Sequence, residues 1–145
     1  MVWDTAGMEM FRSIAISYFR NAIGAMFVYD ITREETFNSI QKWMEDARKH
    51  CDGNCVFMLI GNKTDLEHLR QVDKLELKRL SGSHGMPSME TSAKTVFNVE
   101  EAFTLLVKEV HDQIQNGVIL YKPSHNDSPF PRQLSTETWK KCCKR

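Results

Sequence analysis

Cys55-Val56-Phe57-Met58-Leu59-Ile60-Gly61-Asn62-Lys63-Thr64-Asp65 is a run of apolar residues that passes directly into polar ones. A continuous apolar run of this length is typical of a strand that is buried on both faces of a parallel sheet. In open α/β folds, the residues that follow such strands lie at the edge where ligands bind. Asn62, Lys63 and Asp65 are therefore candidate ligand-binding residues.

The chemistry of these three side chains indicates which ligand they suit. The Asp65 carboxylate can accept two parallel N–H bonds from a ring edge with adjacent donors, which guanine has and adenine lacks. The aliphatic part of Lys63 can lie along the face of a base. Asn62 can either hold its own loop in place or meet the other edge of the ring. The segment therefore predicts a guanine-binding pocket.

A second segment, Glu90-Thr91-Ser92-Ala93-Lys94, follows another short strand-like run. Its position at the end of a strand predicts that it reaches the same edge of the sheet. We expect the backbone N–H of Ala93 to donate to the guanine oxygen, while Ser92 and Lys94 shape the loop.

A third segment, Asp4-Thr5-Ala6-Gly7, follows Val2 and Trp3 as a turn follows a short strand. Asp4 can hold Mg²⁺ through a water molecule, and Gly7 allows a backbone N–H to approach a terminal phosphate. Each of the three segments alone is weak evidence. Their occurrence together, each after a strand-like run, favours a guanine nucleotide site.

The strand-like and helical runs alternate, which predicts a mostly parallel sheet with helices on both faces. Residues 24–31 and 55–61 are expected to be strands that are buried on both faces. Apolar stripes at helical spacing predict helices that pack on the core. Capping boxes are predicted for two of them, and a capping residue for the last, which stops at Gly117. These signals are Thr32 with Glu35, Asp73 with Glu76 (before a helix that carries Leu77 and Leu80 and ends near Gly82 or Gly85), and Asn98.

With these motifs in view, the chain resembles the small GTPases, and among them the Rab family. The segments that carry the resemblance are Trp3-Asp4-Thr5-Ala6-Gly7, Phe11-Arg12-Ser13-Ile14, Tyr18-Phe19-Arg20-Asn21-Ala22 and Phe27-Val28-Tyr29-Asp30-Ile31-Thr32. The resemblance implies a P-loop NTPase-like G domain of the α/β class, with GTP or GDP and Mg²⁺ as cofactors. It divides the chain into a partial Rab-like domain, residues 1–116, and a flexible hypervariable tail, residues 117–145.

The chain departs from the family pattern at its start. The phosphate loop G-x-x-x-x-G-K-[ST] is absent from these 145 residues, and the resemblance implies that the first two strands and the first helix are lacking. We therefore expect weak or no nucleotide binding, and a chain that is marginally stable, prone to aggregate or dependent on a partner. Met8 stands where the family has the glutamine that orients the attacking water. No catalytic residue is expected, and whether the chain is an enzyme stays open.

The tail ends in Cys142 and Cys143, followed by Lys144 and Arg145. The resemblance implies that both cysteines carry geranylgeranyl groups, which would anchor the chain stably to a membrane. It also implies, as partners, a Rab escort protein, a geranylgeranyl transferase, a GDP-dissociation inhibitor and effectors. The expected location is the cytoplasmic face of intracellular membranes and the cytosol, with the chain as a monomer.

Composition and charge exclude few classes of function. Lys and Arg number 19, as do Asp and Glu, so net charge gives no reason to expect nucleic-acid binding. Cys51 and Cys55 are expected to be reduced thiols at the edge of the core, and their convergence with His50 and His68 on a zinc ion is not favoured.

Two functions are compatible with the sequence. The first is a Rab-like, guanine nucleotide-dependent switch in vesicle traffic, of which this chain is a truncated copy whose missing part lies upstream. The alternative is a nucleotide-poor binding module, or a non-functional truncated isoform, that engages escort, prenylation or effector proteins. For effectors, Trp3 and Tyr18 match two members of a three-aromatic patch in Rab proteins, although for Tyr18 core packing is an equal alternative.

Overall fold

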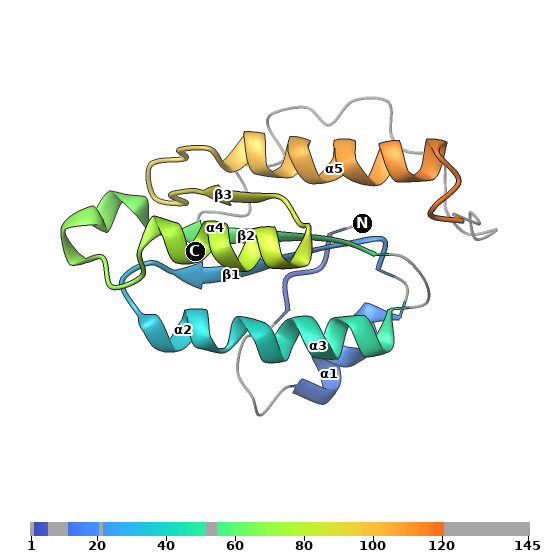
Figure 1. The fold of residues 1–145 in the computed structure, drawn as a ribbon, viewed down its shortest axis with the longest axis horizontal. Coiled ribbons are helices and arrows are strands. Elements are labelled where there is room, and N and C mark those ends of the chain that lie inside the picture. Colours follow the sequence, from blue (N-terminus) through green and yellow to red (C-terminus); the bar gives the residue numbers. More distant parts are fainter. Residues whose placement is uncertain (1, 6–11, 21, 52–54, 121–145) are drawn as a thin grey trace.

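The computed structural model describes residues 2–5, 12–20, 22–51 and 55–120. Within them, three parallel strands form a sheet in the order β1-β2-β3 (Figure 1). The strands are β1 (Gly24–Asp30), β2 (Val56–Asn62) and β3 (Ser88–Glu90). Asp30 lies opposite Asn62, and Glu90 lies opposite Gly61. The carboxyl ends of all three strands therefore meet at one edge of the sheet.

Helices cover both faces of this sheet. The helix α5 (Val99–Gln115) lies on one side, and α1, α2 and α3 lie on the other (Figure 1). These are α1 (Arg12–Phe19), α2 (Glu34–Asn38) and α3 (Ile40–His50); α4 (Lys74–His84) follows the 3₁₀ helix η2 (Thr64–Leu69). None of the helices in the described ranges is long and apolar enough to cross a bilayer.

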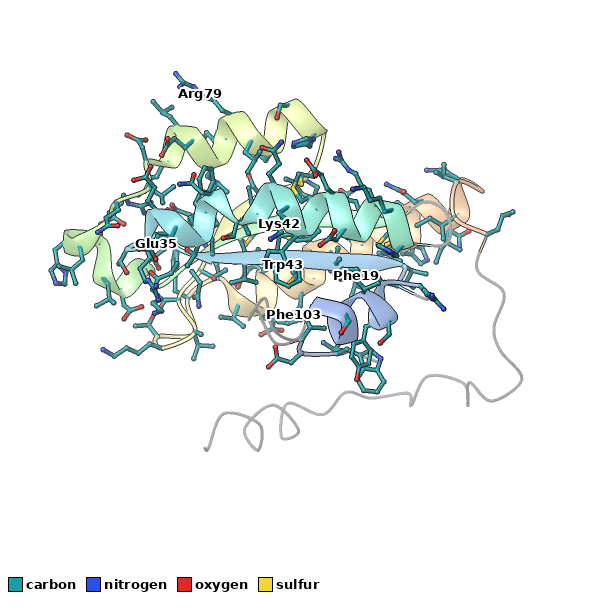
Figure 2. All side chains as sticks on the ribbon, turned by 90° about the horizontal axis from the view of Figure 1, so that it is seen from below. Phe19, Glu35, Lys42, Trp43, Arg79 and Phe103 are labelled. Carbon is teal, nitrogen blue, oxygen red and sulfur yellow. The ribbon has the colours of Figure 1, made fainter. Side chains whose placement is uncertain are left out.

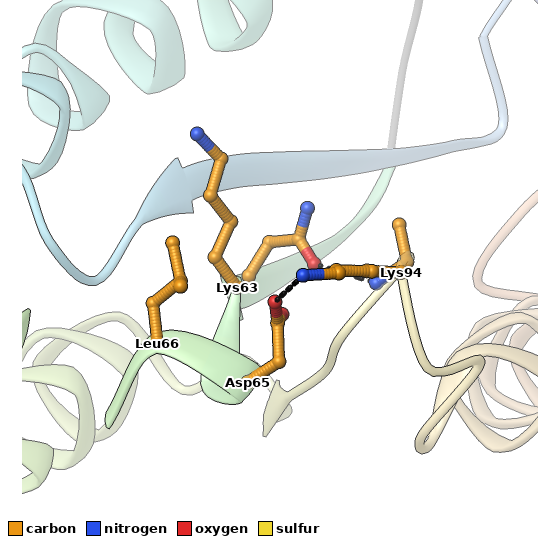
Figure 3. A pocket seen from close by; sticks show the side chains of 6 residues that line it. Lys63, Asp65, Leu66 and Lys94 are labelled. Carbon is orange, nitrogen blue, oxygen red and sulfur yellow. Dashed lines mark hydrogen bonds and ion pairs between the residues drawn. The ribbon is translucent and has the colours of Figure 1, made fainter. Parts of the chain in front are cut away.

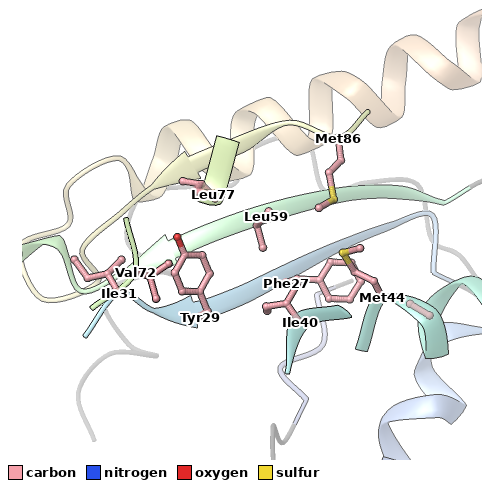
Figure 4. Close-up of a cluster of buried hydrophobic side chains, with 10 residues drawn as sticks. Phe27, Tyr29, Ile31, Ile40, Met44, Leu59, Val72, Leu77 and Met86 are labelled. Carbon is pink, nitrogen blue, oxygen red and sulfur yellow. The ribbon is translucent and has the colours of Figure 1, made fainter. Parts of the chain in front are cut away.

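Two hydrophobic clusters hold the layers together. The larger one joins the sheet to α3 and α4 (Figure 4), and its buried members are Phe27, Tyr29, Ile31, Ile40, Met44, Ala47, Leu59, Val72, Leu77 and Met86. Phe19 on α1 and Trp43 on α3 are partly buried against it, on the same side of the sheet (Figure 2). The smaller cluster, formed by Met58, Ile60 and Ala102, joins the sheet to α5. The predicted α/β architecture with both faces of the sheet covered is confirmed.

The start of α4 is the one predicted by the sequence. The Asp73 carboxylate accepts from the Leu75 backbone N–H at 2.7 Å, and the Asp73 N–H donates to Glu76 at 3.2 Å. The helix ends at Gly85, whose φ of 61° is the left-handed conformation that glycine adopts without a Cβ penalty. The predicted capping box and one of the two predicted ends are thus confirmed.

The other two capping predictions are wrong, because neither predicted side chain makes a capping hydrogen bond. The helix α2 has Arg33 at its N-cap without a side-chain bond, because the Thr32 N–H and hydroxyl both donate to Asp30, at 2.9 and 2.7 Å. Asn98 does stand at the N-cap of α5, but its side-chain amide donates to the Glu90 carbonyl at 2.9 Å. In both cases, the side chain that would have capped the helix is instead hydrogen-bonded to the last residue of a strand, Asp30 of β1 or Glu90 of β3.

The prediction that β1 is buried on both faces is also wrong. Phe27 and Tyr29 are buried, but the side chain between them, Val28, is 54 % exposed. In the part of the chain that the structure describes, β1 has β2 as its single neighbouring strand. The Val28 side chain and one edge of an apolar strand are therefore not covered by the described residues, which is a hazard for edge-to-edge association.

A close contact in the core explains why the residue before the last in β2, Gly61, is a glycine. A Cβ on Gly61 would lie 2.8 Å from the Tyr29 hydroxyl and 3.2 Å from Ile31. The Tyr29 side chain is 2 % exposed, and among the described residues its hydroxyl has no hydrogen-bond partner. Burial raises the pKa of Tyr29 above its usual value. Tyr29 is thus packed tightly over Gly61 at the cost of an unsatisfied polar group.

We expect Gly61→Ala to lower the free energy of unfolding by about 1–3 kcal/mol, because the added methyl group overpacks this contact. Tyr29→Phe in the same chain removes the closest atom and should recover part of the loss. Urea unfolding of the single and double variants measures both effects. Gly82→Ala is the matched control, since a Cβ there meets no atom within 4 Å; equal losses at Gly61 and Gly82 would contradict the packing argument.

We also expect the purified chain to associate with increasing concentration and to melt below about 50 °C, because β1 exposes an apolar edge. Light scattering and calorimetry over a concentration series measure this. A sharp, cooperative, concentration-independent transition of the monomer above that temperature would contradict the expectation.

Candidate functional site

A pocket of about 310 Å³ lies at the carboxyl end of the sheet (Figure 3). It is built from the end of β2, the 3₁₀ helix η2 and the loop after β3. Its lining residues are Asn62, Lys63, Asp65, Leu66, Ala93 and Lys94. Five of these are residues that the sequence predicts for guanine binding; Leu66 was not predicted.

The Asp65 carboxylate is held in place from the loop after β3. The Ser92 hydroxyl donates to Asp65 Oδ1 at 2.6 Å, and Ser92 is itself fully buried and accepts from the Thr95 N–H at 3.2 Å. The other oxygen, Oδ2, is 3.8 Å from the Lys94 ammonium, whose side chain is 78 % exposed. An ion pair this long to an exposed lysine is weak. Asp65 is therefore fixed through one oxygen, while the other can exchange its partner.

Asn62 connects the two loops that line the pocket. Its side-chain oxygen accepts from the Ala93 backbone N–H at 3.1 Å and from the Thr91 hydroxyl at 3.3 Å. Of the two roles expected for Asn62, the structure shows the one in which it holds the loop. The Ala93 N–H, which we expected to donate to a guanine oxygen, is used within the loop, so a base would have to share this donor with Asn62 or displace it.

Lys63 is held by a residue that the sequence analysis missed. Its ammonium lies 2.6 Å from Asp30 Oδ2, and Lys63 adopts a left-handed backbone conformation with φ of 72°. Asp30 ends β1 beside the end of β2, and its side chain is only 11 % exposed. Burial raises the pKa of Asp30, but the hydrogen bonds from Lys63 and Thr32 outweigh it and lower the pKa below its usual value. The signal for Asp30 was its place as the only charged residue of the predicted strand 24–31, one position before its end.

A comparison with models of protein families matches residues 1–112 to the Ras family. The chain belongs to the Ras family. Members of the Ras family are small GTPases, which switch between states by binding guanine nucleotides with Mg²⁺, and the three parallel strands with their helices are a partial form of the α/β fold of these proteins. The pocket of this Ras-family chain contains the segments that the sequence predicted for the base.

The structure describes only one of the two residues predicted to bind phosphate and magnesium in this Ras-family chain. Asp4 is exposed and does not line the pocket, while Gly7 and Met8 lie outside the described residues. Within the described ranges there is no group of three side chains that could hold a metal ion. Asp4 alone does not make a magnesium site, because Mg²⁺ prefers octahedral coordination with several oxygen ligands.

An ion-pair network next to the pocket of this Ras-family chain joins η2 to β3. Arg70, which follows η2, donates to Glu67 at 2.6 Å and to Glu90, at the end of β3, at 2.7 Å. Its side chain is 14 % exposed, and its guanidinium also donates to the Val72 carbonyl at 2.9 Å. Two-sided contacts of a guanidinium give geometric specificity. Arg70 thereby fixes η2, which carries Asp65, to the end of the third strand.

We expect Asp30→Asn to lower the free energy of unfolding of this Ras-family chain by about 1 kcal/mol at pH 7, because it removes the charged acceptor of Lys63. Since the pKa of Asp30 is lowered by folding, its contribution is complete above its unfolded pKa of about 4 and is lost as pH falls through the folded value. The difference between wild type and variant should therefore be constant from about pH 7 to 5 and shrink below about pH 4.

Urea unfolding at several pH values measures this difference. Glu35→Gln is the control, because Glu35 pairs with Arg33 at an exposed site and should change stability little. A wild-type advantage that grows as the solution is acidified would show that the pair does not act in this way.

Proposed function

We propose that this chain recognises the guanine base of a nucleotide in the pocket at the carboxyl end of its sheet. The observation that carries the proposal is the position of Asp65. Its carboxylate is buried to 12 % exposure, oriented by Ser92, and shares one pocket with Lys63 and Ala93.

The hydrogen-bonding pattern of this pocket supports guanine over adenine. A carboxylate accepts and cannot donate, so it is matched by the adjacent N–H and NH₂ donors of the guanine edge. The same edge of adenine lacks this pair of donors and would leave the buried Asp65 carboxylate without partners. Because Asp30 holds its ammonium group, Lys63 would present its aliphatic part as one wall of the pocket.

We expect ligand-observed NMR titrations of the 145-residue chain to show a preference of about tenfold for guanosine monophosphate over adenosine and xanthosine monophosphates. In Asp65→Asn the side chain gains a donor, which matches the carbonyl of xanthine, so the preference between guanosine and xanthosine monophosphate should reverse. Asp112→Asn on α5 is the matched control and should behave as wild type. A wild-type chain that binds all three nucleotides equally, or a variant whose preference is unchanged, would contradict the proposal.

We further infer that the chain is of the Rab type and acts at membranes in vesicle traffic. The support is the resemblance of its segments to Rab proteins and the pair Cys142 and Cys143 close to the C-terminal end of the sequence. Both cysteines lie outside the described residues. Two attached lipid chains would anchor the protein where one would not, and the basic residues beside them would favour an anionic leaflet.

Incubation with escort protein, geranylgeranyl transferase and lipid donor should attach two lipids to the chain, one to either Cys142→Ser or Cys143→Ser, and none to the double variant. Intact mass measures the modification, and co-sedimentation with vesicles should follow it. The variant Cys51→Ser serves as control and should be modified like wild type. Failure to modify the wild-type chain, while an ordinary Rab protein is modified in the same mixture, would contradict the inference.

One observation favours the alternative function, a module that binds proteins without switching. The rings of Trp3 and Tyr18 are in contact, with their centroids 4.8 Å apart and their planes tilted by 33°, and the two residues are 58 % and 36 % exposed. Exposed aromatic pairs are common anchors of protein interfaces. Titration with fluorescent GDP separates the two functions: nanomolar affinity supports the switch, and negligible affinity supports the binding module.

A further inference from the structure

Two cysteines face each other at the amino end of β2, away from the base pocket. Cys51 follows the last residue of α3, and its backbone N–H donates to the Ala47 carbonyl at 2.8 Å. Cys55 precedes the first residue of β2, Val56, whose N–H donates to the Ile23 carbonyl at 3.0 Å. The backbone at each cysteine is thus held in place by the secondary structure beside it.

A hydrogen bond joins the side chains of these two residues. Neither is in a disulfide, and both are half-buried. Cys51 also packs against the larger hydrophobic cluster, and the Cys55 thiol is 3.8 Å from the Val56 carbonyl. Two thiols joined by a hydrogen bond, on positions fixed by a helix end and a strand start, are close enough in space to be candidates for a disulfide.

We propose that Cys51 and Cys55 are a redox modification site that forms a reversible disulfide with low-molecular-weight disulfides, such as oxidised glutathione. In the first step a Cys51 thiolate attacks one glutathione sulfur, the S–S bond of glutathione breaks, and one glutathione thiolate leaves. In the second step a Cys55 thiolate attacks the sulfur of Cys51 and expels the second glutathione. Overall, two protein thiols are oxidised, and the protons they lose end on two molecules of reduced glutathione.

The surroundings of the two thiols indicate this order of attack. The hydrogen bond with Cys51 and burial raise the pKa of Cys55, so Cys55 keeps its proton as long as Cys51 is unmodified. The thiolate is the nucleophile in disulfide exchange. Once Cys51 carries glutathione, the effect of its thiol on Cys55 is lost and the second step can follow.

The disulfide would join the end of α3 to the start of β2. Asn62, at the opposite end of the same strand, begins the base pocket. The modification therefore does not depend on guanine binding. The redox proposal can fail while the proposed function holds, and the reverse is also true.

The test uses the 145-residue chain with Cys142→Ser and Cys143→Ser, which leaves Cys51 and Cys55 as its two thiols. The chain is equilibrated with mixtures of oxidised and reduced glutathione, quenched with acid and analysed by intact mass. We expect the intact mass to fall by two hydrogen atoms, with no glutathione attached to the protein. Peptide maps should show a cross-link between positions 51 and 55. In native buffer, half-oxidation should need at least about tenfold less oxidised glutathione than in urea, because the fold brings the sulfurs together.

Single variants in the same background test the order of attack. Cys51 in Cys55→Ser should take up glutathione at least about tenfold faster than Cys55 in Cys51→Ser, with circular dichroism confirming that both variants keep their helices. Addition of two glutathione molecules to the parent chain, or equal half-oxidation in native buffer and urea, would overturn the proposal. Equal rates in the two single variants would overturn the assigned order.

Discussion

The architecture of the pocket depends on one side chain, the amide of Asn62. Its oxygen accepts bonds from Thr91 and Ala93 in the loop after β3, while its backbone ends β2. Backbone bonds between the same two segments, from Thr91 to Gly61 at 2.8 Å and from Thr64 to Thr91 at 3.1 Å, act in parallel. Together these bonds fix the loop that carries Ser92 beside Asp65, and Ser92 in turn orients the carboxylate.

The sheet extends the same constraint to β1, whose end also lies beside the pocket. Parallel pairing in register places the last residues of β1 and β2 next to each other, so Asp30 can reach the Lys63 ammonium. The tight contact of Tyr29 with Gly61 lies one residue earlier on both strands. Packing of the core and geometry of the pocket are therefore coupled: a side chain at Gly61 would disturb both the strand pairing and the residues that follow it.

The sequence predicts the parts of this structure that depend on local pattern. Apolar runs predict β1 and β2, spacing predicts the helical regions of α2 to α5 but not α1 or η2, and the residues after the strands predict five of the six that line the pocket. What it misses depends on competition between distant groups. Thr32 could have capped α2, but Asp30 takes both of its donors. Ala93 was expected to have a free N–H, but Asn62 accepts it. The exposure of Val28 depends on which elements lie beside β1, and no pattern within the strand reveals this.

The most direct test of the guanine pocket is an NMR titration that follows the backbone amides of the ¹⁵N-labelled chain as guanosine is added. We predict shifts concentrated at Asn62, Lys63, Asp65, Ala93 and Lys94, with the Ala93 amide moving as its bond to Asn62 is shared. Adenosine at the same concentration should leave these amides in place. Shifts elsewhere in the chain, or the same shifts with adenosine, would contradict this prediction.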